Sequence, residues 1–360
     1  MSNLQWVKPP HCQWAGRLIF DGAVARIEGD IRFDGVARQL EEIWRLEGYC
    51  QRLDLALAEP IDLRQARGSL TRDNPTARRA TPSASVERII LQENVDLRIQ
   101  QLDLLGNAKS LERIVVPVLT FHVVEQQLVG GGEGWINSKF LSQSSGLGQL
   151  ASRETAAAKQ PTLQGAHLIF RDSMVAFLDR NEIVFDGKVR LAAGPLRNWD
   201  DAIDLNKMTQ LTVEQMLLNC DQLKVVDTSG LSTTVALQSN TTQALEFQAT
   251  GNVSFEGKAD TGTYLGSAHQ TTYVQLKDQL ILRGDGRTPA MLKKVPANSQ
   301  VEATWQGYVN EATINIKTLG ITNFQLAQAQ VELPGAGASA NAPAAPDPRS
   351  GVTDFLQPRP

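Results

Sequence analysis

The stretch Asn181-Glu-Ile-Val-Phe-Asp-Gly-Lys-Val-Arg-Leu191 has apolar residues at positions 183, 185, 189 and 191, with Gly187 between them. The stretch Leu245-Glu-Phe-Gln-Ala-Thr-Gly-Asn-Val-Ser-Phe255 repeats this pattern around Gly251. Because successive side chains alternate across a strand, each stretch places its aliphatic and aromatic residues on one face and its polar residues on the other. Both stretches therefore predict strands with one apolar face, bent or bulged where the glycine stands.

The same pattern recurs elsewhere with similar text. Phe20-Asp-Gly-Ala-Val24 is followed by Tyr49-Cys-Gln-Arg-Leu53, much as Phe185-Asp-Gly-Lys-Val189 is followed by Asn219-Cys-Asp-Gln-Leu223. A further unit begins at Gln92-Glu-Asn-Val95. Units that each have one apolar face are stable when they stack and bury a continuous lining. We therefore expect an all-β fold of stacked jelly-roll or solenoid-like units, with long polar loops and a disordered C-terminal tail.

Shifts in composition set the expected boundaries. Stretches rich in Ser, Gly, Ala and Pro contain too few bulky apolar residues to form a core. We expect a first β unit over 1–63, an Arg-rich loop over 64–86, a second β unit over 87–136, a polar loop over 137–164, a third β region over 165–333 and a disordered Ala/Pro-rich tail over 334–360. Helical patterns are few, and the best candidates are the short stretches Glu41–Arg45 and Thr212–Leu218.

Composition also excludes several classes of function. The 360 residues carry a net charge of −4 and only 6% are aromatic, which argues against a nucleic-acid partner, since that needs a basic surface and stacking rings. The four histidines and three cysteines lack metal-ligand or C-x-x-C spacing, so we expect no metal, cofactor, disulfide framework or enzymatic activity. The first ten residues lack the features of a secretory signal, which fits either a cytosolic protein or an internal piece of a longer exported chain.

Three motifs in the third region suggest a family. They are Thr250-Gly-Asn-Val253, Leu218-Asn-Cys-Asp-Gln-Leu223, and a hairpin that runs from Tyr273 through Leu280 and Leu282 to Gly284. Their order resembles the OstA/LptA-like family of cell-envelope proteins, best over 165–325. The resemblance implies a β-jelly-roll with a V-shaped section in the periplasm or cell envelope. There its hydrophobic interior would hold acyl chains of lipopolysaccharide during outer-membrane biogenesis, and other envelope-transport β-jelly-rolls would be its partners.

The apolar rows are the candidate site. The residues expected to line a lipid-binding groove are Ile183, Phe185, Val189, Leu191, Leu223, Phe247, Val253, Phe255, Leu280 and Leu282. Each buried methylene contributes about 0.8 kcal/mol, so an acyl chain could bind here without any catalytic residue. The alternation is equally compatible with a closed core, in which the two sheets pack on each other, and with an open groove, in which they splay.

These patterns leave three hypotheses for the function. The first is a non-enzymatic envelope protein that binds or bridges lipopolysaccharide-like amphiphiles. The second is a structural scaffold whose exposed terminal strands associate end to end. The third is a carbohydrate-binding β domain, which predicts a surface cluster of tryptophans and carboxylates, whereas the six tryptophans are scattered along the sequence.

Overall fold

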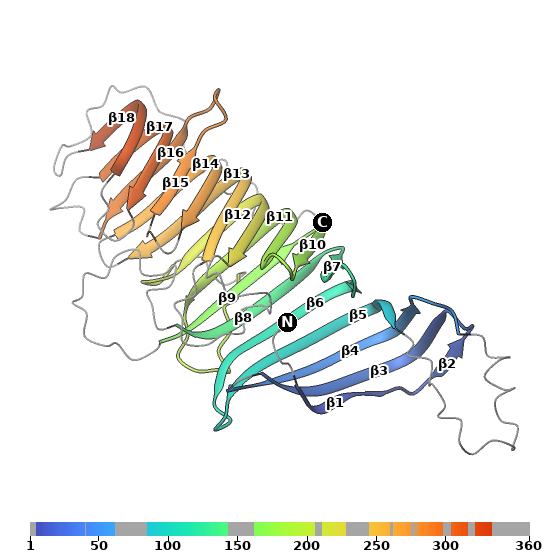
Figure 1. Cartoon of the computed structure of the whole chain (residues 1–360). Helices are drawn as coiled ribbons and strands as arrows, with labels where there is room; N and C mark the ends of the chain where they lie inside the picture. The colour runs from blue at the N-terminus through green and yellow to red at the C-terminus, as the bar shows by residue number, and fades with distance from the viewer. Residues whose placement is uncertain are drawn as a thin grey trace, which may run out of the picture.

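The protein is all-β in the computed structural model (Figure 1). The structure describes residues 5–39, 41–61, 85–142, 162–205, 211–227, 245–259, 262–274, 277, 279–297, 304–315 and 321–332. Within these ranges no α-helix occurs, and the strands are β1 (Gln5–Gln13), β2 (Arg17–Phe20), β3 (Val24–Gln39), β4 (Glu42–Leu57), β5 (Val86–Asp103), β6 (Ala108–His122), β7 (Gln127–Gly131), β8 (Gly134–Ser142), β9 (Thr162–Phe170), β10 (Ser173–Phe177), β11 (Glu182–Pro195), β12 (Met216–Asp227), β13 (Leu245–Ala259), β14 (Gly262–Val274), β15 (Gln279–Arg283), β16 (Ala290–Pro296), β17 (Thr304–Asn315) and β18 (Ile321–Glu332).

The strands form a single antiparallel sheet of 18 strands. Figure 1 shows them stacked from β1 and β2, in blue, to β18, in red. At four levels two short strands lie end to end against a long one: β1 and β2 against β3, β7 and β8 against β6, β9 and β10 against β11, and β15 and β16 against β14. The all-β prediction is therefore confirmed, and one hydrogen-bonded ladder connects all the expected β units.

The expected boundaries differ from the strands in detail. β8 runs to Ser142 and β9 begins at Thr162, so both ends of the expected 137–164 loop belong to the sheet. Residues 62–84, which hold most of the expected Arg-rich loop, lie outside the described residues, as do 143–161 and the expected tail over 334–360. The two helical predictions are wrong, because residues 42–45 lie in β4 and residues 216–218 begin β12.

A line of bulges crosses the sheet. Consecutive residues with positive φ occur in β3 at Gly29 and Asp30, in β5 at Glu93 and Asn94, in β11 at Gly187 and Lys188, and in β13 at Gly251 and Asn252. The pairing register with the neighbouring strands shifts at each of these positions. Bulges bend strands and add twist, so the aligned bulges form one bend line along the sheet.

Buried positions show how the sheet folds at this line. In β12 the buried residues are Leu218 and Cys220 before the bend and Leu223 after it, so the buried side of the strand switches parity. In β11, Phe185 before the bulge and Val189 after it are both buried. Residues from both sides of the bend line share one hydrophobic core. The sheet therefore folds over itself into two arms that enclose this core.

We call the two sides of the bend line the first and second arms. The first arm contains β2, β7, β10 and β15 with the parts of the long strands that pair with them. The second arm contains β1, β8, β9 and β16 with the remaining parts. Phe170 of β9 and Phe185 of β11 lie on opposite sides of the line, with ring centroids 5.7 Å apart.

Candidate functional site

The predicted lining residues all lie on the inner face of the folded sheet. Those nearest the bend line are buried: Phe185, Val189, Leu191, Leu223, Val253 and Leu282. The others are partly buried against the core or farther from the bend: Ile183, Phe247, Phe255 and Leu280. Leu282 and Leu280 belong to a second core cluster, which Phe255 joins to the main one. The structure thus brings the predicted residues together on one apolar face and packs its centre tightly.

The first arm stays apolar away from the bend. Its second row from the line pairs across successive strands and contains Leu55, Ile89, Phe121, Leu128, Ile183, Val225 and Phe247. We call these residues the apolar wall. All are only partly buried, unlike the residues beside the bend. The wall therefore offers a partly exposed hydrocarbon surface on β4 to β7 and again on β11 to β13, with the buried Ala176 of β10 between Leu128 and Ile183.

The second arm becomes polar with distance from the bend. Here the third and fourth inward rows from the line carry several polar groups and one tryptophan, together with apolar residues such as Leu46, Ile99 and Phe140. We call this set the polar rim: Glu42, Trp44, Gln101, Ser110, Glu112, Ser138 and Gln164. Sequence reasoning did not find the rim. Each member continues the inward parity of its own strand, but only the pairing register shows that these residues share one surface.

Hydrogen bonds organise one end of the polar rim. Gln101 Nε2 donates to Glu42 Oε2 at 2.6 Å, and both residues are buried. Lys109 Nζ donates to Glu42 Oε1 at 3.1 Å, and Ser110 Oγ donates to Gln101 Oε1 at 3.2 Å. The network therefore holds the Ser110 hydroxyl in place through the buried Gln101, whose partner Glu42 is paired with Lys109.

Glu112 and Trp44 are rim residues outside this network. Burial raises the pKa of the Glu112 carboxyl, and no neighbouring cation in the described part of the chain opposes this shift. The indole N–H of Trp44 is buried and has no hydrogen-bond partner among the described residues. Burying a polar group without a partner costs free energy, so the stability of the fold does not explain the Trp44 indole N–H, nor a Glu112 carboxyl whose ionised form burial disfavours.

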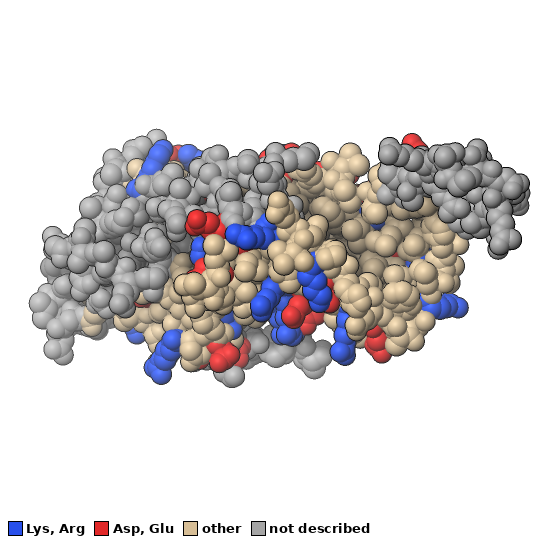
Figure 2. All heavy atoms as spheres, turned by 60° about the horizontal axis from the view of Figure 1, so that its bottom comes forward, with Lys and Arg blue, Asp and Glu red and all other residues tan. Residues whose placement is uncertain are grey.

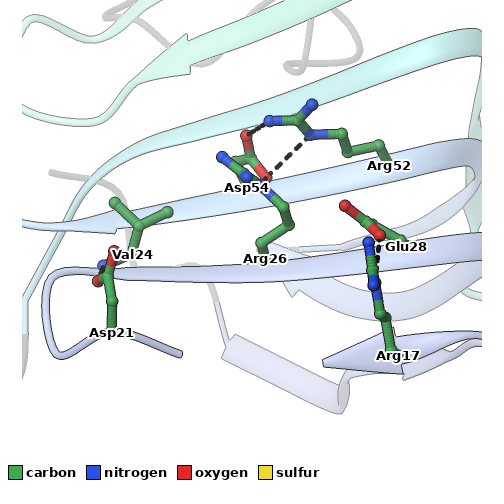
Figure 3. A network of polar contacts seen from close by, with 7 residues as sticks. All are labelled: Arg17, Asp21, Val24, Arg26, Glu28, Arg52 and Asp54. Carbon is green, nitrogen blue, oxygen red and sulfur yellow. Dashed lines mark hydrogen bonds and ion pairs between the residues drawn. The ribbon is translucent and has the colours of Figure 1, made fainter. Parts of the chain in front are cut away.

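The outer face is charged and paired. Asp54 of β4 accepts hydrogen bonds from Arg26 at 3.0 Å and from Arg52 at 2.8 Å, while Arg17 contacts Glu28 at 2.6 Å (Figure 3). Burial opposes ionisation of Asp54, but the bonds from Arg52 and Arg26 outweigh it and lower the pKa. Figure 2 shows basic and acidic side chains lying next to one another among wide uncharged areas of the face drawn.

One tryptophan on the outer face has polar neighbours. Trp135 lies 5.1 Å from the guanidinium of Arg113 and stacks on His167, with ring centroids 5.8 Å apart. Asp96 binds the same Arg113 at 2.6 Å, and Asn137 Oδ1 lies 2.6 Å from His167 Nδ1. The Asp96 carboxylate is thus already paired with Arg113. In this cluster the carboxylate is therefore not free to bind a sugar beside the tryptophan, as the third hypothesis, a carbohydrate-binding domain, predicts.

The edge formed by β1 and β2 exposes large apolar side chains. Val7 is 65% exposed and Leu18 is 53% exposed, and Trp6, Trp14 and Ile19 are also exposed. Leu18 pairs with the buried Ile27 and Trp6 pairs with the buried Ala37, so both continue the inner face to the end of the stack. The apolar interior therefore reaches solvent at this edge.

Cys50 and Cys220 are buried in the apolar core, and Cys12 is partly buried beside it. All three are free, and burial raises the pKa of Cys50 to about 11 and that of Cys220 to about 12. In the described ranges no group of three or more His, Cys, Asp or Glu residues is placed to hold a metal ion. Nor does any described helix have the length and hydrophobicity needed to cross a membrane.

The chain matches no protein-family model and no curated protein. The function therefore has to be argued from the inner face of the sheet and its two ends.

Proposed function

We propose that this chain is a non-enzymatic protein of the periplasm or cell envelope that binds or bridges lipopolysaccharide-like amphiphiles on the inner face of its folded sheet. The observation that carries the proposal is the apolar wall, whose residues on β4 to β7 and on β11 to β13 are only partly buried, with the buried Ala176 of β10 joining the two parts. The resemblance of Thr250–Val253 and Leu218–Leu223 to OstA/LptA-like motifs supports the same class of ligand.

The geometry suits an extended chain better than a compact ligand. Adjacent strands lie about 4.8 Å apart, and the wall presents one side chain on each successive strand, such as Ile183, Val225 and Phe247. An acyl chain lying across the strands would contact these side chains in series. Each methylene that leaves water contributes about 0.8 kcal/mol, so a single acyl chain would supply substantial binding free energy.

Photo-crosslinking tests the proposal directly. We would replace Phe247 with p-benzoylphenylalanine and, as a matched control, place the same residue at Gln248, which lies on the opposite face of β13. Both proteins would be purified from a bacterium with an outer membrane, irradiated and analysed by mass spectrometry. We expect an acylated adduct with Phe247→p-benzoylphenylalanine and none with the control. Absence of an adduct at both positions, with no amphiphile in native mass spectra, would overturn the proposal.

A second candidate function is the end-to-end scaffold. Its support is the β1–β2 edge, where Trp6, Val7 and Leu18 are exposed on terminal strands. Exposed apolar edge strands promote association. Sedimentation of delipidated protein at increasing concentration tests this function. Oligomers that persist without lipid and are lost in Leu18→Asp would support it, and a monomer at all concentrations would exclude it.

A further inference from the structure

The polar rim places polar and charged side chains on an inner face where a closed β core would have apolar ones. Glu42 and Gln101 are buried together, with Lys109 and Ser110 bonded to them. The second inward row from the bend is apolar in both arms, with Leu97, Ile114 and Ile136 in the second arm, and the polar rim lies one and two rows farther from the bend. A buried ionic network gives little net stability relative to apolar packing, so stability alone gives no reason for a polar second arm.

The available groups of the rim have a distinct chemistry. Glu112 and Ser138 pair directly across β6 and β8, and both are partly exposed. Trp44 pairs with Gln101 across β4 and β5 and provides an indole ring with an unpaired N–H. A carboxyl group, hydroxyls, an amide and an indole together offer both hydrogen-bond donors and acceptors, as well as an apolar ring face.

The charges of the polar rim favour some amphiphile headgroups over others. The rim contains the carboxyl groups of Glu42 and Glu112, while Lys109 already binds Glu42 at 3.1 Å. A phosphate would meet these carboxyl groups without a free cation from the described rim residues. Sugar hydroxyls can both donate to the carboxyl oxygens and accept from the indole N–H, so an uncharged sugar satisfies the rim where an anion does not.

We propose that the polar rim binds the uncharged, hydroxyl-rich sugar portion of an amphiphile whose acyl chain lies on the apolar wall. This inference rests on the proposed function and specifies its ligand. Glu112 and Ser138 contact the sugar hydroxyls, and Trp44 packs on the sugar and donates its N–H. Glu42 and Gln101 are positioning residues, because they are buried and hold Ser110 in place.

Titration calorimetry with two detergents of equal chain length tests the proposal. Dodecyl maltoside and dodecyl phosphate would be titrated into the delipidated full chain below their critical micelle concentrations. We expect the maltoside to bind about tenfold more tightly, the equivalent of about one hydrogen bond to a charged group. Equal affinities, or tighter binding of the phosphate, would overturn the sugar assignment and leave the proposed function standing. Binding of neither detergent would overturn both.

Two matched variants locate the effect. Glu112→Leu should weaken dodecyl maltoside about fivefold or more, since it removes the carboxyl that accepts hydrogen bonds from the sugar, without weakening dodecyl phosphate. Glu47→Leu makes the same change on the exposed outer face of β4 and should leave both affinities unchanged. The melting temperature of Glu112→Leu should equal or exceed that of the wild type, because burial disfavours the ionised form of this carboxyl and the substitution removes that cost. Unchanged maltoside affinity in folded Glu112→Leu would overturn the assignment.

Discussion

The bend in β13 gives a sharp test of the fold through the substitution Gly251→Ala. Gly251 has a φ of 72°. In this region a residue with a Cβ destabilises the fold by about 1–2 kcal/mol. A Cβ built at this position lies 2.8 Å from Cβ of Asp221 and overlaps its carboxylate, and such overpacking costs about 1–3 kcal/mol. We therefore expect Gly251→Ala to lower the free energy of unfolding by about 2–5 kcal/mol.

Urea denaturation followed by amide hydrogen exchange of β12–β14 would measure this loss. Asp221 also accepts a hydrogen bond from Asn252 at 2.7 Å, so Asp221→Ala and the double variant are needed to complete a double-mutant cycle. The double variant should regain the part of the loss due to the Asp221 carboxylate and keep the parts due to φ and to the contact between the two Cβ atoms at 2.8 Å. Gly131→Ala, where a Cβ meets no atom within 4 Å, is the control. Equal urea midpoints for Gly251→Ala and Gly131→Ala would refute the structural role assigned to the bulge.

Three further predictions follow from burial and charge. The pKa of Asp54 is lowered, so its ion pairs stabilise the fold fully above the ordinary carboxyl pKa of about 3.9 and are lost as the pH falls through the folded-state pKa. Asp54→Asn should therefore be less stable than the wild type at pH 7. In a series of denaturations at decreasing pH, this difference in stability should vanish. Leu223→Ala should cost about 2–5 kcal/mol in urea because the side chain is fully buried, whereas Leu18→Ala at the exposed edge should change the midpoint little. Only the thiolate reacts with disulfide reagents, so native protein at pH 8 should label more slowly at the buried Cys220 than at the partly exposed Cys12, and urea should remove the difference.

The strands and the bend could be predicted from the sequence because both have local signals. Alternation over 181–191 and 245–255 indicated one apolar face, and Gly187 and Gly251 marked the positions where the structure has bulges. The helical prediction at Glu41–Arg45 failed because Ile43 and Trp44 are adjacent apolar residues on opposite faces of β4. In a stretch of only three to five residues, the sequence pattern of a strand with apolar residues on both faces is the same as that of a helical turn.

The polar rim could not be predicted because it is a property of the ladder. Glu42, Gln101 and Glu112 are far apart in sequence, and each is an ordinary polar residue in its own strand. Only the register, with Trp44 opposite Gln101 and Gln101 opposite Ser110, places these residues on one inner surface. The parity switch at Cys220 and Leu223 likewise depends on a bulge in the neighbouring strand.

The burial gradient bears on whether the inner face acts as a closed core or an open groove. Leu223 and Val253 beside the bend are almost completely buried. A ligand that separated the arms there would expose about as much apolar surface as it covered, so the hydrophobic gain would cancel. Val225 and Phe247 in the apolar wall are only partly buried, so a ligand lying there removes surface from water without breaking existing contacts. The two alternatives therefore apply to different rows of one sheet: the row beside the bend holds the fold together, and the proposed acyl site lies along the wall.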